Sequence, residues 1–272
     1  MEESDKKKQD KQKVTIFPVP FKLKKIEENI TITTHTPTKS SKEQIINQAL
    51  KFHAQGNISE ATKYYQELIN QGCNDYRVFS NYGVILQNLG NLQEAEKNYR
   101  KSIELNPDFA DAHSNLGGIL RNSSKLQEAE LSTRKAIELN PNLAEAHSNL
   151  GGILNDLGKL QVAELSYRKA LELNPNLAEA HSNLGNILID LGKLQEAELS
   201  LRKAIELNPN FTNAHFNLVN TLNQLGKLQE AELSLRKAIE LNPNFANAYL
   251  NLGVILKDLG KLEEAEISTR KA

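Results

Sequence analysis

An all-α solenoid, built from stacked helix-turn-helix units, is the fold that the sequence predicts. Two observations carry this prediction: a proline recurs at intervals of 34 residues, and the apolar residues between successive prolines follow helical spacing. The recurring prolines end the motif ELNP: Pro107, Pro141, Pro175, Pro209 and Pro243. A single helical hairpin cannot bury both of its apolar faces, so each unit must stack on the next. We therefore expect one continuous superhelix.

The period divides most of the chain into seven units, of which the last is cut short. Their predicted bounds are 42–75, 76–109, 110–143, 144–177, 178–211, 212–245 and 246–272. In the unit that begins at residue 144, the apolar positions predict two helices of about three turns each. Gly151 and Ala163 lack the bulk that would hold the two helix axes apart. We therefore expect close antiparallel packing within each unit.

A glycine lies at the predicted turn between the two helices. Gly158 occupies the place where a residue in the left-handed conformation ends the first helix, and Pro175 follows the second helix, which cannot continue through it. Equivalent glycines recur at Gly56, Gly90, Gly192, Gly226 and Gly260. Only the third unit departs, because Ser124 stands at this position.

The first 41 residues differ in composition from the repeats. They hold nine Lys against six acidic residues and no Arg, and three prolines interrupt them. Such a chain cannot bury enough apolar area to offset the entropy of ordering, so we expect residues 1–41 to form a flexible, mostly disordered leader. Its apolar residues support two interpretations, an unfolded stretch or a docking motif: Val14, Ile16, Phe17, Val19 and Phe21.

The composition excludes several classes of protein. A single cysteine, Cys73, leaves no internal disulfide framework and no cysteine-based zinc site. A formal net charge of -1 argues against a nucleic-acid-binding protein, which normally carries a basic excess. No stretch approaches the roughly 18 apolar residues of a membrane span, and the amino terminus has no apolar signal-peptide core. We expect a soluble, cytoplasmic protein that binds neither nucleic acid nor membranes.

The second helices carry a recurrent pair of opposite charges. In six units a Glu precedes an Arg by four residues, which is the favoured order for a helical ion pair: Glu96 and Arg100, Glu130 and Arg134, Glu164 and Arg168, Glu198 and Arg202, Glu232 and Arg236, Glu266 and Arg270. Because each Arg has its own Glu, the sequence predicts a solvated outer face instead of a basic stripe for nucleic acid.

The units resemble the tetratricopeptide repeat, whose signature has a large residue, Leu-Gly, a bulky residue, Ala, an aromatic, Ala and Pro at fixed places. The matching residues of one unit are His147, Leu150, Gly151, Leu154, Ala163, Tyr167, Ala170 and Pro175. The resemblance implies a right-handed superhelix whose first helices line a concave groove. It also implies that this groove is where a peptide is held.

An asparagine precedes the Leu-Gly pair, or its replacement, in every unit: Asn47, Asn81, Asn115, Asn149, Asn183, Asn217 and Asn251. Each amide offers a donor and an acceptor, so it can pair with a peptide group of an extended ligand. The series is similar to the asparagine ladder that lines the repeat domain of the O-linked N-acetylglucosamine transferases. Passive duplication of Asn, with a bond between neighbouring units, is the alternative interpretation.

Three apolar residues near the carboxyl-terminal end complete the predicted peptide-binding site. Phe216, Leu250 and Val254 occupy groove positions and either anchor a partner side chain or pack against further chain. The chaperone-binding members of the family place Lys and Arg in the groove to clamp a terminal carboxylate. Here Glu145 and Glu179 occupy two of the corresponding places, so capture of an acidic chaperone tail is not expected.

No catalytic constellation emerges from the sequence. Histidines recur at 34-residue spacing, but stacked units hold them about 10 Å apart, too far for one metal ion, so we assign them to helix packing: His113, His147, His181 and His215. We expect no cofactor and no metal. The sequence predicts a non-catalytic scaffold for an extended peptide or a protein.

Two alternatives remain open at this point. The chain is the substrate-selecting repeat region of a larger glycosyltransferase-like or other modifying enzyme, or it is a module that self-associates through an uncapped carboxyl-terminal end to form a homodimer.

Overall fold

The computed structural model describes residues 42–272, and this part of the chain folds into fourteen α-helices without strands. The first helices of the units are α1 (Lys42–Ala54), α3 (Tyr76–Asn88), α5 (Ala110–Asn122), α7 (Ala144–Asp156), α9 (Ala178–Asp190), α11 (Thr212–Gln224) and α13 (Ala246–Asp258). The second helices are α2 (Ile58–Asn70), α4 (Leu92–Leu105), α6 (Leu126–Leu139), α8 (Leu160–Leu173), α10 (Leu194–Leu207), α12 (Leu228–Leu241) and α14 (Leu262–Arg270). The all-α solenoid prediction is confirmed. The predicted leader, residues 1–41, lies outside the described residues.

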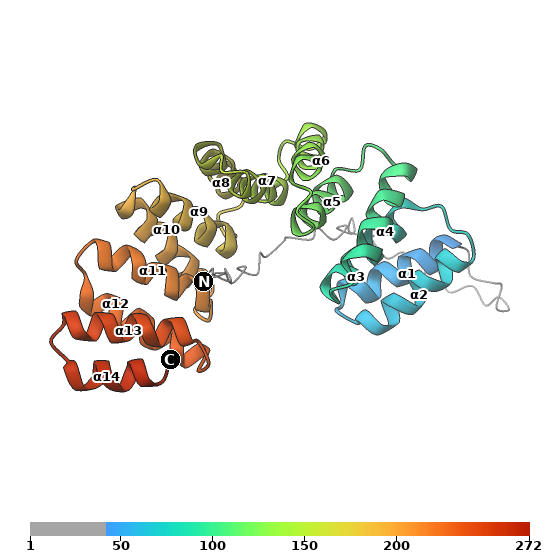
Figure 1. Cartoon of the computed structure of the whole chain (residues 1–272). Helices are drawn as coiled ribbons and strands as arrows, with labels where there is room; N and C mark the ends of the chain where they lie inside the picture. Colours follow the sequence, from blue (N-terminus) through green and yellow to red (C-terminus); the bar gives the residue numbers. More distant parts are fainter. Residues whose placement is uncertain (1–41) are drawn as a thin grey trace, which may run out of the picture.

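The helices follow an arc, with α1 and α2 at one end and α13 and α14 at the other (Figure 1). Each helix packs on its neighbours in the chain, and from α1 to α11 each first helix also contacts the first helix of the next unit. The second helices make no comparable contacts with one another among the described residues. Successive units therefore lie closer together on the side of the first helices, and the first helices form the inner, concave face of the arc.

The predicted turns have the predicted backbone. Gly158 has a φ of 73°, and the equivalent glycines also have positive φ values. The amide of Lys159 donates to the carbonyl of Leu154 at 2.8 Å, which satisfies a carbonyl left free at the end of α7. Ser124 has a φ of 58°, so the same turn forms in the third unit at a steric cost that glycine avoids.

Small residues bring the two helices of a unit together as predicted. A Cβ atom on Gly151 would lie 2.8 Å from the ring of Tyr167, which is fully enclosed between α7 and its neighbours. Gly83 lies equally close to the ring of Tyr99 in the second unit. Interiors of this density do not accept an extra methyl group without displacement, so this glycine sets the spacing within a unit.

The outer face, formed by the second helices, carries every predicted Glu–Arg pair, with N–O distances of 2.5 to 2.9 Å. Five of the glutamates bind a second cation, a lysine that precedes the second helix of the next unit, at 2.7 to 3.2 Å. We call these five glutamates and their cations the outer-face network: Glu96, Glu130, Glu164, Glu198 and Glu232. The network therefore links units as well as helical turns.

The electrostatics of Glu164 illustrate the network. Burial alone would raise the pKa of its carboxyl group, but hydrogen bonds from Lys193 and Arg168 outweigh burial and hold the pKa below its ordinary value. Arg168 continues the chain of charges to Glu196 of the next unit. Arg134 has no such continuation within the described residues, because Val162 stands where the other units have Glu.

No helix between residues 42 and 272 combines the length and the apolar character that a bilayer crossing requires.

Candidate functional site

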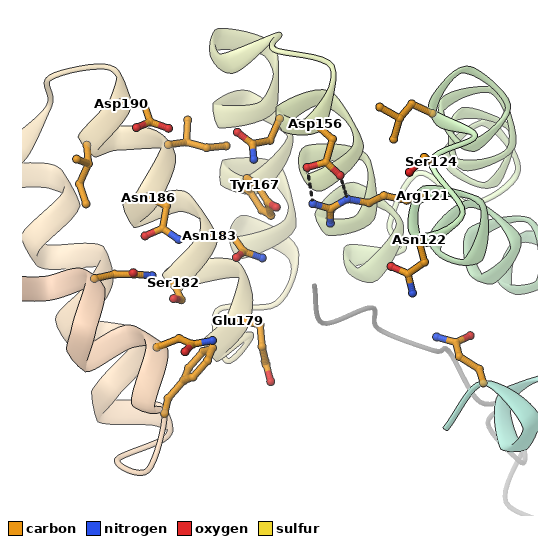
Figure 2. Close-up of a pocket in the computed structure, with 18 of the residues that line it drawn as sticks. Arg121, Asn122, Ser124, Asp156, Tyr167, Glu179, Ser182, Asn183, Asn186 and Asp190 are labelled. Atoms are coloured by element: carbon orange, nitrogen blue, oxygen red, sulfur yellow. Dashed lines mark hydrogen bonds and ion pairs between the residues drawn. The ribbon is translucent and has the colours of Figure 1, made fainter. Parts of the chain in front are cut away.

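The concave face holds a groove of about 1140 Å³ that runs across five units. Its walls come mainly from the carboxyl-terminal halves of α3, α5 and α7 and from much of α9 and α11. Figure 2 shows polar side chains from α5, α7 and α9 directed into this space. Carboxamides dominate the polar lining: Gln87, Asn88, Asn122, Asn155, Asn183, Asn186, Asn213, Asn217 and Asn220. Such a surface presents donors and acceptors in equal measure.

The seven predicted asparagines do not form one uniform row. Asn183 and Asn217 line the groove. Asn149 instead donates to the hydroxyl of Ser114 in the preceding unit, at 3.1 Å, which is the inter-unit bond of the alternative interpretation. Asn81 donates to the carbonyl of Arg77 in its own helix, at 2.9 Å. Asn115 is fully buried, whereas Asn47 and Asn251 are half-buried and lie outside the lining of the groove.

The groove floor contains an ion pair that the sequence analysis missed, in which the arginine side chain is 9% and the aspartate side chain 31% exposed. Arg121 of α5 reaches across to Asp156 of α7, with its Nε and Nη2 atoms 2.5 and 3.0 Å from the two carboxylate oxygens (Figure 2). Gly152 makes room for this arrangement, because a Cβ atom there would lie 2.1 Å from Nη1 of Arg121. The doubled glycine, Gly151 and Gly152, was the available signal in the sequence.

Tyr167 of α8 reaches the groove from behind the first helices and lies near Asn183 (Figure 2). Burial raises the pKa of its phenol to about 12, so the hydroxyl keeps its proton at neutral pH. A hydrogen bond with Asn183 contributes in the opposite direction. Tyr167 is 2% exposed, so it lies beneath the groove surface and supports Asn183 from the interior of its unit.

The three predicted apolar site residues differ in exposure. The ring of Phe216 packs against that of Phe245, with centroids 4.7 Å apart, so part of this side chain is already covered. Leu250 and Val254 on α13 are 46% and 54% exposed. They form an apolar continuation of the inner face beyond the carboxamide-lined part.

The recurrent histidines have a local role that the spacing did not reveal. The Nε2 atom of each lies 2.8 to 3.0 Å from the carbonyl oxygen of the proline six residues earlier: His113 and Pro107, His147 and Pro141, His181 and Pro175, His215 and Pro209. Each histidine thereby fixes the connection that leads into its own helix. This agrees with the assignment of these residues to packing.

Family models cover most of the helical region. Residues 178–211 and 200–232 match models of the tetratricopeptide repeat, and residues 151–188 and 220–260 match a further model of the same repeat. Residues 47–153 match the middle TPR-like domain of cilia and flagella-associated protein 70. The repeats of this chain are tetratricopeptide repeats. Such repeats generally serve as non-catalytic scaffolds for protein interactions.

Solved tetratricopeptide repeat structures have the same architecture. YrrB, described as a TPR protein with an unusual peptide-binding site, is 26% identical with a TM-score of 0.52, over 68% of this chain and 95% of YrrB. MamA is 27% identical with a TM-score of 0.55, over 57% of this chain and 91% of MamA. PilF of Pseudomonas aeruginosa, with a TM-score of 0.63 at 21% identity over 78% of this chain and 90% of PilF, is similar in fold. No curated protein matches the chain by sequence.

Proposed function

We propose that this chain is a non-catalytic protein-interaction scaffold that holds an extended segment of a partner protein in its concave groove. One observation carries the proposal: a single groove of about 1140 Å³ crosses five units, and nine of its lining residues are Asn or Gln. Helices that pack side by side leave this face open along its whole length, so a chain can lie across them instead of ending in a closed pocket.

The proposed binding mode follows from the spacing of the units. Packed helices lie about 8–10 Å apart, and an extended chain advances about 3.3 Å per residue, so each unit faces about three ligand residues. Asn183 and Asn217 are equivalent residues of adjacent units. The amide of Asn217 can donate to and accept from a peptide group, and Asn183, which already shares a hydrogen bond with Tyr167, offers its remaining donor and acceptor. This is the part of the asparagine ladder that remains available to a ligand.

The apolar end of the inner face would add side-chain selectivity. Leu250 and Val254 are exposed on α13, and the partly covered ring of Phe216 precedes them on α11. We expect an apolar ligand side chain at this end, with hydrogen bonds to the ligand main chain in the middle. The peptide-binding site described for YrrB supports a peptide ligand for the same kind of repeat.

The test selects peptides and then removes the amides that would hold them. A random peptide library is panned on the full chain, and the affinity of the selected peptides is measured by fluorescence anisotropy. The groove variant is Asn183→Ala/Asn217→Ala/Asn220→Ala. The matched control replaces three exposed asparagines in the turns before first helices: Asn142→Ala/Asn176→Ala/Asn210→Ala.

Loss of several ligand hydrogen bonds predicts binding at least about tenfold weaker in the groove variant, with little change in the control. Both variants must retain the helical content of the parent chain, measured by circular dichroism. Equal affinity for the parent and the groove variant would exclude the groove as the binding site.

A further inference from the structure

We infer that the segment held in the groove is basic, with a Lys or Arg at about every third residue. This inference rests on the proposed function and adds the chemistry of the ligand. It depends on three features of the described residues: carboxylates without counterions, polar side chains in the groove without partners, and the spacing of the units.

The middle of the inner face carries carboxylates that bind no cation in the described part of the chain. Glu179 and Asp190 line the groove at opposite ends of α9 (Figure 2). Glu145 occupies the position equivalent to Glu179 on α7, one unit earlier; it is half-exposed and lies beside the groove, outside its lining. The nearby cation, Arg121, is already neutralised by Asp156. The groove therefore presents negative charge that the fold leaves uncompensated.

The same chain neutralises its carboxylates elsewhere. On the outer face, each glutamate of the outer-face network has two cations within 3.2 Å. Glu145 and Glu179 are only half-exposed, so part of their hydration is lost without a compensating ion pair. A cationic side chain of a ligand would supply that pair, and an acidic ligand would meet repulsion.

Two buried polar side chains in the groove give independent support for a ligand. Asn217 is 8% exposed and Ser182 is 2% exposed, both line the groove, and neither forms a hydrogen bond with another described residue. Their polar atoms are not among the fully enclosed atoms without a partner in the described part of the chain, which are the hydroxyl oxygens of Thr133, Ser148 and Thr221, so they remain accessible from the groove. Ser182, Asn183 and Glu179 all line the groove within the first half of α9, so a main chain bonded to Ser182 would pass near the carboxylate of Glu179.

The spacing of the carboxylates sets the spacing of the ligand cations. Glu145 and Glu179 are one unit apart, which is about 8–10 Å for packed helices. Three residues of extended or polyproline II chain span about 9–10 Å. A basic residue at about every third position therefore matches successive carboxylates, whereas a cluster of adjacent basic residues does not.

The experiment uses the full chain and three fluorescein-labelled peptides of equal length. The first contains four Lys-Ser-Ser triplets, the second has the same composition with its four lysines adjacent, and the third contains four Glu-Ser-Ser triplets. The groove variant is Glu145→Gln/Glu179→Gln/Asp190→Asn. The control variant Glu138→Gln/Glu172→Gln/Glu206→Gln removes the same charge from exposed positions on the second helices.

We expect the spaced lysine peptide to bind most tightly by fluorescence anisotropy at about 50 mM salt, where surface charges are only partly screened. Its affinity should fall at least about tenfold in the groove variant and less than about twofold in the control. Equal losses in both variants, or equal binding of the glutamate peptide, would overturn the inference.

The inference and the proposed function can fail separately. If the panned peptides lack basic residues and bind the carboxylate variant normally, but lose affinity with the asparagine variant, the groove binds peptides and the basic ligand is wrong. If the asparagine variant also binds normally, the proposed function fails as well.

Discussion

The outer face and the groove use the same residue types in opposite ways. Glutamates on the outer face lie between cations of their own unit and the next, whereas Glu179 in the groove binds no other described residue. The asparagine amides differ in the same way. Asn149 donates a hydrogen bond to Ser114 of the preceding unit, whereas the side chain of Asn217 forms no hydrogen bond with another described residue. Polar groups between units stabilise the stack, and those left without partners are available to a ligand.

The largest expected effect concerns acid pH and the outer face. The pKa values of all five network glutamates lie below the ordinary value of 4.5. Their contribution to stability is therefore complete above about pH 4.5 and is lost as the pH falls through the lowered pKa values. Urea unfolding followed by circular dichroism between pH 7 and pH 3 should show a falling midpoint. A chain with all five glutamates changed to Gln should lose much of this dependence; an unchanged slope would contradict it.

The next largest effect compares two adjacent glycines of α7, one facing the interior of the unit and the other facing the groove. Gly151 faces the enclosed ring of Tyr167, so Gly151→Ala should lower the free energy of unfolding by about 2 kcal/mol. Gly152 faces the guanidinium of Arg121, which ends a long side chain with several rotatable bonds. Gly152→Ala gains helix propensity while displacing this guanidinium, so we expect a change below about 1 kcal/mol. Urea unfolding measures both, and equal losses would show that the groove side is packed as tightly as the interior.

Neutralising one carboxylate on each face gives a smaller effect on stability and compares the two faces directly. Glu164 is 8% exposed between Arg168 and Lys193, each 43% exposed, so Glu164→Gln should cost about 1 kcal/mol after allowance for solvent screening. Glu179→Gln removes no internal ion pair and should change stability by less than about 0.5 kcal/mol. A comparable loss at both positions, measured by urea unfolding at pH 7, would remove the distinction between the two faces.

The smallest expected effect concerns Val162, which stands where other units have a glutamate that pairs with the arginine of the preceding unit. Val162→Glu should give Arg134 the partner that Arg168 finds in Glu196, and stabilise the fold by about 0.3–0.5 kcal/mol at low salt. Val162 is exposed, so no interior contact is lost. The neutral variant Val162→Gln is the control. Thermal unfolding at low and high salt should show the gain only for Glu and only at low salt.

Features that arise within one unit were predictable from the sequence. The two helices, the turn at Gly158, the close contact at Gly151 and the Glu–Arg pairs each depend on residues that are few positions apart or on one helix pair. Helical periodicity and a glycine or proline at a fixed place determine them without knowledge of the neighbouring unit.

Features between units were not predictable, because the rotation from one unit to the next is absent from the spacing. The lysine that binds Glu164 comes from 29 residues later, and the sequence did not assign it a role. The asparagines looked equivalent, yet the rotation and the local side chains bring Asn149 to Ser114 and leave Asn217 open to the groove. Arg121 and Asp156, 35 residues apart, meet for the same reason.

The ion pairs between second helices also bear on how such a chain can change its length. Lys193 meets Glu164 and Lys227 meets Glu198 through the same residues in the same register. If one 34-residue unit among these copies were duplicated or deleted, the new interface between units would therefore contain the same Lys–Glu ion pair as the existing interfaces. A gain or loss of one unit would lengthen or shorten the stack by one unit and would change its stability by the contribution of that unit and one interface, so the length of the stack and its stability change together.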